Sequence, residues 1–265
     1  MKKILMMILC GGLLVACSSS SGYDVKVTDA SSSLLSGNNV TITKQDYFEQ
    51  LLDTYAANEI LNEAISSIAD KELTDKDAIT KLLEEKTKTY AEYSGGDLEK
   101  YIKQAGYSSK EEFTNSILLP SVKRELLIKK YIEENLDKMI KDYQVCSFKK
   151  ITVDKESTAL TLIKEATTEA KFDAKMKEYG TSAEDAGVVT KNSTLDDNLK
   201  AKLEKLSAVT KDGIYSEAIK LSDDNYAVIY IYGSDHKNKD KITTALSSDS
   251  TAQKDIEAIY LKKYN

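Results

Sequence analysis

GIYSEAIKLSDDNYAVIYIY, residues 213–232, contains two runs rich in β-branched and aromatic residues, 214–221 and 226–232. Such runs are typical of strands. The SDDN tetrapeptide between them, residues 222–225, favours a tight turn. We therefore expect a hairpin-like pair of strands in the last third of the chain.

The segment before this pair changes from a helical to a mixed pattern near residue 144. Residues 145–153 alternate loosely as a strand, and the residues after them favour helices and one loop. The expected helices are 156–167, 170–179 and 195–206, and the expected loop is 180–193. The resulting order, β-α-α-α-β-β, predicts a small α+β module over residues 144–236.

Outside this module, apolar residues recur at three- and four-residue spacing, which indicates amphipathic helices. Thr43 followed by Asp46 resembles a capping box, and Pro120 is expected to kink or break a helix near residue 118 or 119. The expected helices are 43–68, 74–93, 97–105, 108–143 and 251–264. The predicted fold class is α+β, with a mostly helical domain over 40–143, the inserted module, and a linker and helix over 237–265.

The N-terminal sequence MKKILMMILCGGLLVAC has a two-lysine start, a short apolar stretch and small residues before Cys17. The stretch is shorter than the about 20 apolar residues that span a bilayer, so residues 1–16 are predicted to be a signal peptide. An uncleaved or conventionally cleaved leader is the alternative. Residues 17–39 are rich in Ser, Gly and Asn and are expected to be a flexible tether.

The tetrad Leu14-Val15-Ala16-Cys17 resembles the lipobox of bacterial lipoproteins. This resemblance implies that Cys17 is lipidated and that the protein is anchored on the extracytoplasmic face of the membrane. Cys10 would then leave with the signal peptide, and Cys146 would remain as the one thiol. We interpret Cys146 as a small buried hydrophobe rather than a nucleophile.

The composition excludes several classes of function. The 265 residues carry a net charge of −6, which leaves no basic excess for a nucleic-acid partner. The single histidine, His236, has no second histidine or free cysteine nearby, so we expect no metal site. We interpret the acidic pairs Asp196-Asp197 and Asp223-Asp224 as helix-start and turn residues rather than as general acids and bases. The chain has no GxSxG, P-loop or GxGxxG motif, and we expect no cofactor.

The order of these features resembles the PrsA-like foldase lipoproteins, which are relatives of the SurA periplasmic chaperones. It comprises the lipobox, the Ser-rich tether, a helical segment opening with ITKQDYF at 42–48, a module of about 90 residues and a final helix. The sequence GYSSKEEF at 106–113 also looks like the family's turn between helices. The resemblance implies that the helices before and after the module pack together as a chaperone domain. It also implies that the module is a parvulin-type peptidyl-prolyl isomerase domain.

The segment GIYSEAIK followed by NYAVI is similar to the closing pattern of parvulins, with departures from it. Asn225 replaces a glycine, Ala218 replaces a proline and Ala227 replaces an active-site histidine. In the opening strand, Lys150 stands where parvulins carry the other histidine, and the glycine-rich middle motif is reduced to Ala186-Gly187. We therefore assign no catalytic residue, and whether the protein is an enzyme stays open.

Together these observations predict a membrane-anchored foldase or chaperone whose parvulin-like module is weak or inactive as an isomerase. Its expected partners are unfolded exported polypeptides and, through the lipid, the membrane. Tyrosines in the helical part suit adaptable contacts with such chains, although ordinary core packing explains them too. A surface lipoprotein that binds a small ligand or scaffolds an envelope complex is the alternative, and a homodimer is left open.

Overall fold

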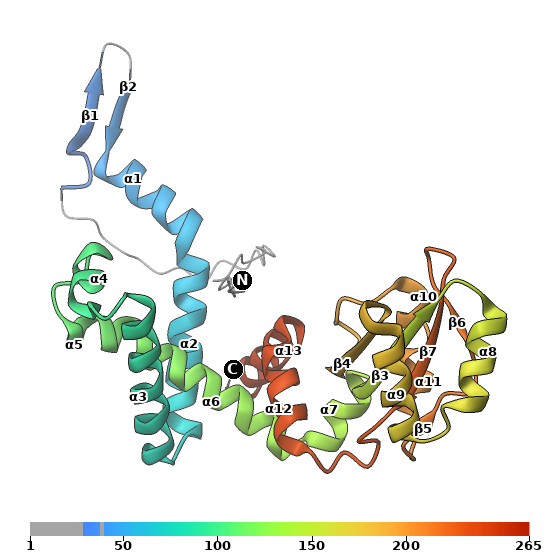
Figure 1. Cartoon of the computed structure of the whole chain (residues 1–265). Coiled ribbons are helices and arrows are strands. Elements are labelled where there is room, and N and C mark those ends of the chain that lie inside the picture. The colour runs from blue at the N-terminus through green and yellow to red at the C-terminus, as the bar shows by residue number, and fades with distance from the viewer. Residues whose placement is uncertain (1–28, 38–39, 265) are drawn as a thin grey trace. The chain divides into compact units, whose positions relative to one another are not determined.

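The computed structural model describes residues 29–37 and 40–264 (Figure 1). The signal peptide predicted for 1–16, the lipidation site Cys17 and most of the predicted tether lie outside the described residues. Two compact units, 1–67 and 68–265, divide the chain. Among the described helices, none is long and apolar enough to cross a membrane.

The described part of the first unit contains an antiparallel hairpin of β1 (Ser33–Gly37) and β2 (Val40–Thr43). We expected the whole of 17–39 to be a flexible tether, and this is wrong for β1. Leucines and β-branched residues flank Gly37 and two asparagines, which is a pattern that favours a hairpin. The serine-rich composition led us to predict no strand here, whereas β1 forms by pairing with β2.

A long helical stretch follows the hairpin. The predicted capping box is confirmed, because Asp46 N–H donates to Thr43 Oγ1 at 3.1 Å and Thr43 N–H donates to Asp46 Oδ2 at 2.8 Å. The helix runs as α1 (Lys44–Leu51), a π-helical turn (Leu52–Ala56) and α2 (Ala57–Glu72).

The helices of the second unit follow the end of α2. They are α3 (Lys76–Tyr93), α4 (Leu98–Gln104), α5 (Lys110–Phe113), α6 (Leu119–Glu134) and α7 (Leu136–Asp142). A π-helical turn, Thr114–Leu118, separates α5 from α6, and Pro120 occupies the first turn of α6. The irregularity expected near residues 118 and 119 is therefore present as a π-helical turn, which accommodates a proline without ending the helix.

Two helices at the C-terminal end pack against this part. We expected α13 (Ser250–Tyr264) but interpreted the residues of α12 (Lys239–Ser248) as a linker, which is wrong. Ile242 and Leu246 of α12 are buried and four residues apart, so they lie on one face of the helix. α13 packs on α6 through Tyr131 and Tyr260, whose ring centroids are 5.8 Å apart, and through an Arg124–Glu257 ion pair.

The module between α7 and α12 is built around one antiparallel sheet with the order β4-β3-β7-β5, and β6 also pairs with β7. Its strands are β3 (Cys146–Val153), β4 (Ala183–Val189), β5 (Gly213–Ile214), β6 (Ile219–Lys220) and β7 (Tyr226–Ile231). Its helices are α8 (Glu156–Glu165), α9 (Glu169–Tyr179), α10 (Asp197–Lys200) and α11 (Leu203–Ser207).

Strand β4 corrects our expectation that 180–193 is a loop. Residues 183–187, AEDAG, are poor strand formers, so their pairing with β3 outweighs their local preference. The register shifts between Phe148 and Lys149, and Gly187 opposite Phe148 has a φ of +67°. A left-handed glycine beside a register shift is typical of a β-bulge.

Helices cover both faces of this sheet and make two apolar cores. One core joins Phe148, Ala227 and Ile229 to leucines of α10 and α11, and the other joins Ile151 and Val228 to α8 and α9. The chain is thus mostly helical with one small antiparallel sheet, so the predicted α+β class is confirmed.

Candidate functional site

Lys150 and Ala227, which stand at the expected histidine positions, lie on neighbouring strands. In the β3–β7 register, Lys150 is opposite Ile229 and Thr152 is opposite Ala227. Residues that are directly opposite share a face of the sheet, and so do residues two apart on one strand. The structure therefore brings both positions to the same face, where they are diagonal neighbours.

Neither side chain reproduces an imidazole at this place. Lys150 Nζ lies 2.9 Å from Glu184 Oε1 of the edge strand β4, so its charge is used in an ion pair. Ala227 is fully buried and belongs to the same apolar core as Leu199, Leu203 and Leu206. The arrangement has a donor-only ammonium group at one position and a methyl group at the other, and it offers no acceptor–donor pair for proton transfer.

The other departures from the parvulin pattern divide between the two faces of the sheet. Ala186 is half-buried against the core that contains Ala227, and the left-handed Gly187 follows it. Ala218 is half-buried against the core on the opposite face. The sheet thus brings Ala186, Gly187 and Ala227 together and separates Ala218 from them.

Two further sequence candidates have structural environments that explain them. Cys146 is buried, and burial raises the pKa of its thiol to about 12, so it is unsuited to act as a nucleophile. His236 lies in a loop with a φ of +52°. No group of three metal-ligating side chains occurs among the described residues.

The acidic pairs serve the local backbone. Asp196 accepts from the backbone N–H groups of Asn198 and Leu199 at the start of α10, and from that of Ser222. Asp223 accepts from the backbone N–H of Asn225 in the turn before β7. These contacts agree with our interpretation of the pairs as helix-start and turn residues.

One charged cluster of the module was not expected from the sequence. Lys149 Nζ is 2.8 Å from Glu169 and 2.6 Å from Asp173 of α9, and it lies 5.6 Å from the ring centroid of Tyr232. Burial lowers the pKa of Lys149, but its hydrogen bonds to Asp173 and Glu169 outweigh burial and raise the pKa above its ordinary value. Lys149 therefore stays charged and ties β3 to α9.

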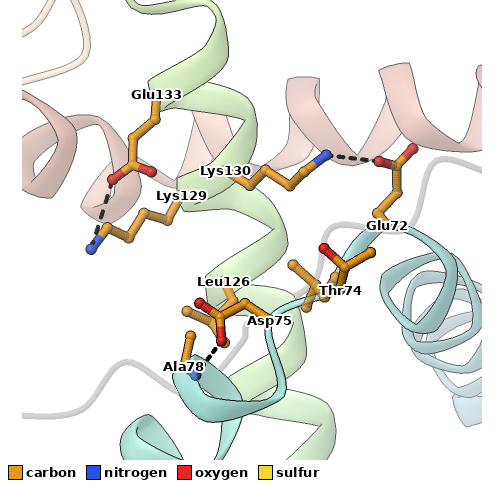
Figure 2. Close-up of a pocket in the computed structure, with 9 residues that line it drawn as sticks. Glu72, Thr74, Asp75, Ala78, Leu126, Lys129, Lys130 and Glu133 are labelled. Atoms are coloured by element: carbon orange, nitrogen blue, oxygen red, sulfur yellow. Dashed lines mark hydrogen bonds and ion pairs between the residues drawn. The ribbon is translucent and has the colours of Figure 1, made fainter.

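A second candidate site is a cleft of about 260 Å³ between the α2–α3 connection and α6 (Figure 2). Its lining has an apolar part and a charged part. The residues are Glu72, Leu73, Thr74, Asp75, Ala78, Leu126, Lys129, Lys130 and Glu133. Figure 2 shows two ion pairs in its lining: Lys130 with Glu72, which joins α6 to the end of α2, and Lys129 with Glu133, which lies along α6. Together they neutralise most of its charge.

In this charged part, Glu72 accepts hydrogen bonds from three side chains. It accepts from Lys130 at 2.9 Å, from the Tyr264 hydroxyl at 2.9 Å and from Lys263. Hydrogen bonds from Lys263, Lys130 and Tyr264 lower the pKa of Glu72 to about 2, and the bond to Glu72 raises the pKa of Lys130 to about 12. No sequence signal marks Glu72, because its partners lie up to 192 residues away.

A third feature is the apolar surface of the first unit. We call Leu35, Val40 and Ile42 the hairpin face, because the pairs Leu35–Ile42 and Gly37–Val40 place all three on one side of the hairpin. They are 58%, 57% and 37% exposed, whereas Ser36 and Thr41 occupy the other side. Exposed apolar residues gathered on one side of a hairpin are suited to contact another molecule.

The chain is similar to solved structures of PrsA proteins, the same family that the sequence resembles. The foldase protein PrsA from Streptococcus pneumoniae is 20% identical with a TM-score of 0.35, covering 88% of this chain and 93% of that chain. PrsA from Bacillus subtilis is 20% identical with a TM-score of 0.41, covering 89% and 94%. The peptidylprolyl isomerase PrsA from Bacillus cereus is 15% identical with a TM-score of 0.44, covering 88% and 92%. No protein-family model matches the chain, and no curated protein matches it.

Proposed function

We propose that this protein is an extracytoplasmic, lipid-anchored foldase that binds unfolded exported polypeptides and does not catalyse prolyl isomerisation. The observation that carries the proposal is what surrounds Lys150 and Ala227, the residues at the two expected histidine positions. The first is held in an ion pair with Glu184, and the second is buried under leucines. A parvulin-like module with these two side chains can keep its fold, but this face of its sheet lacks the paired imidazoles expected for catalysis.

The physical reason lies in the barrier to rotation of a prolyl peptide bond, which is about 18–20 kcal/mol. An isomerase must bind the twisted amide more tightly than the planar one. Here, Leu199, Leu203 and Leu206 fill the core on the relevant face, and no neutral imidazole is present to support a twisted amide. Lys150 is not a substitute, because its ammonium group can only donate.

Binding of unfolded chains is supported by the apolar side chains that the first unit leaves in solvent. Besides the hairpin face, these are Leu34, Tyr47, Leu51, Leu52 and Ile60. Such residues can hold exposed apolar segments of another polypeptide without ATP, since the contact needs only burial of apolar area.

Membrane anchoring rests on the sequence alone. The lipobox-like tetrad ends at Cys17, and acyl chains on that thiol would hold the protein at the membrane. Cys17→Ala is expected to release the protein from membranes or to retain its leader. Mass spectrometry of the membrane-extracted protein tests this, and an unmodified Cys17 side chain would contradict it.

The alternative function, a lipoprotein that binds a small ligand, finds its specific support in the α2–α3/α6 cleft. Its volume of about 260 Å³ admits a small molecule, and its lining combines Leu73, Ala78 and Leu126 with charged groups. The ion pairs there already satisfy Glu72 and Lys130, which leaves few free groups for specific recognition. We therefore prefer the foldase.

Two measurements on the full chain test the proposal. We expect the protein to suppress aggregation of a chemically unfolded client at stoichiometric amounts and without ATP. We also expect no acceleration of cis/trans exchange in an X-Pro peptide followed by NMR. Failure to suppress aggregation would contradict the foldase, and exchange as fast as with an ordinary parvulin would contradict the inactive module.

A further inference from the structure

The first unit combines its exposed apolar residues with an unusual charge. Between residues 29 and 67 the sequence has six carboxylate side chains and one lysine, a net charge of −5. The carboxylates are Asp29, Asp46, Glu49, Asp53, Glu59 and Glu63. The lysine, Lys44, lies 3.9 Å from Asp29, so its charge is already partly balanced.

Exposed apolar residues also occur in the helix that follows the hairpin face. Tyr47 and Leu51 are four residues apart in α1, which places them on the same side of the helix. They are 50% and 36% exposed, and no residue of α1 is buried. Glu49 of α1 and Asp53 of the π-helical turn are also exposed, and because they follow Tyr47 and Leu51 by two residues they lie on the other side of this helical stretch. An incoming chain would therefore meet apolar area on one side of this stretch, within a segment whose overall charge is negative.

We propose that the hairpin face and α1 bind a basic amphipathic segment of an unfolded polypeptide. This inference rests on the proposed foldase function and names its substrate class. Apolar side chains of the segment cover Leu35, Val40 and Ile42, and its lysines and arginines are attracted by the net charge of −5 that residues 29–67 carry. Long basic side chains suit such a surface because their methylene stems lie along apolar surface while the charge stays in water.

The charge decides between this occupant and two others. A second copy of residues 29–67 would bring another net charge of −5 against the first, and like charges oppose such a contact. An anionic bilayer would be repelled for the same reason. A basic segment gains both apolar burial and attraction, and the attraction speeds its association.

Two labelled peptides test the inference with the full chain in fluorescence anisotropy. One alternates leucine with lysine, and the other alternates leucine with glutamate at the same positions. We expect the lysine peptide to bind at least about tenfold more tightly at low salt, and its affinity to fall as salt screens the charges. Equal affinities, or binding that does not depend on salt, would overturn the inference.

Two variants locate the site. Leu35→Thr with Ile42→Thr keeps strand propensity but removes apolar area, and we expect about tenfold weaker binding of the lysine peptide. Leu160→Thr is the matched control, since Leu160 is 43% exposed on α8 of the module, and it should leave binding unchanged. Glu49→Gln with Asp53→Asn should weaken binding and flatten its salt dependence, whereas Glu84→Gln with Glu85→Gln on α3 should do neither.

The outcomes separate this inference from the proposed function. If the chain suppresses aggregation but the hairpin and α1 variants bind the lysine peptide like the wild type, the foldase stands and the inference fails. If the chain does not suppress aggregation, the proposed function fails. Dimerisation that the Leu35→Thr/Ile42→Thr variant abolishes, seen by analytical ultracentrifugation, would assign the face to a second copy. Binding to phosphatidylglycerol vesicles would assign it to a membrane. Either result overturns the inference.

Discussion

Ala227 shows how one residue can separate the fold of a module from its chemistry. It lies on the central strand β7, fully buried, in the core that Phe148 and the leucines of α10 and α11 complete. A methyl group fits such a core, whereas an imidazole adds volume and two polar nitrogen atoms that need partners. The replacement is therefore part of the packing and cannot be reversed at that position alone.

We expect Ala227→His to lower the free energy of unfolding by about 2–4 kcal/mol, from overpacking and from a buried polar group. Urea unfolding of the full chain, followed by circular dichroism, measures this. The matched control is Ala201→His at the exposed end of α10, which should change stability by less than about 0.5 kcal/mol. An unchanged stability in Ala227→His would show that the face has room for an imidazole.

The contribution of Glu72 to the stability of the fold depends on pH. Its pKa is about 2 in the folded protein, because Lys263, Lys130 and Tyr264 donate hydrogen bonds to it, and its ordinary value is 4.5. A lowered pKa means that the carboxylate stabilises the fold above about pH 4.5 and that this contribution is lost as the pH falls towards 2.

Glu72→Gln should therefore be less stable than the wild type by about 1–2 kcal/mol at pH 7, allowing for screening of these charges by solvent. Near pH 2 the difference should shrink to a small fraction of this value, because the wild-type carboxyl is then fully protonated in the unfolded chain and about half protonated in the folded protein. Urea unfolding at both pH values checks this, with Glu84→Gln on α3 as the control. A difference that persists unchanged at pH 2 would contradict the assignment to ionised Glu72.

At the scale of elements, local signals predicted those helices and strands whose ends carry capping or turn residues. Asp97 and Ser109 cap α4 and α5, close to the starts that the sequence indicates, and β7 begins where its pattern begins. β4 and α12 were missed for a physical reason. AEDAG has little strand propensity of its own, and α12 has a polar, lysine-rich start, so both depend on partners distant in sequence.

The contacts of the candidate site also divide into those that the sequence predicts and those that it does not. The pairing of β3 with β7 follows from two recognisable strands, so placing Lys150 and Ala227 on one face needs only their register. The contacts of Lys149 and of Glu72 join groups that are 20 to 192 residues apart in the sequence. No pattern within one segment indicates such contacts, because each depends on how separate elements pack.

Asp249 gives a prediction at this scale, since it lies between α12 and α13 and serves two elements. It accepts from the backbone N–H groups of Thr251 and Ala252 at the start of α13, and from the side chains of Thr190 and Asn192 after β4. Its loss therefore removes a helix cap and a tie to the module at once.

We expect Asp249→Ala to cost about 1–2 kcal/mol more than Asp75→Ala, whose carboxylate caps only α3. Urea unfolding of both variants makes the comparison. A second test is hydrogen exchange at the end of β4, which should quicken in Asp249→Ala and not in Asp75→Ala. If both variants lose the same stability and exchange at β4 is unchanged, Asp249 acts only as the cap of α13.

At the scale of the whole molecule, the helical part depends on residues from both sides of the module. α13 supplies partners for three residues of α2 and α6: Lys263 for Glu72, Glu257 for Arg124 and Tyr260 for Tyr131. The module has its own two cores on either face of the sheet, which α8 to α11 cover. The two parts should therefore respond differently to loss of the C-terminal helix.

Deleting residues 250–265 removes the buried side chains of Ile256 and Tyr260, which together contribute on the order of 3–6 kcal/mol as an upper estimate. We expect backbone amides of α6 to exchange much faster in the truncated protein, because α6 loses its packing partner, while amides of β3 and β7 keep their protection. Hydrogen exchange with mass spectrometry resolves both segments in one sample. Unchanged protection of α6 would show that α3 and α12 are enough to hold it. Simultaneous loss of protection in β3 and β7 would show that the module folds only together with the helices, as one cooperative unit.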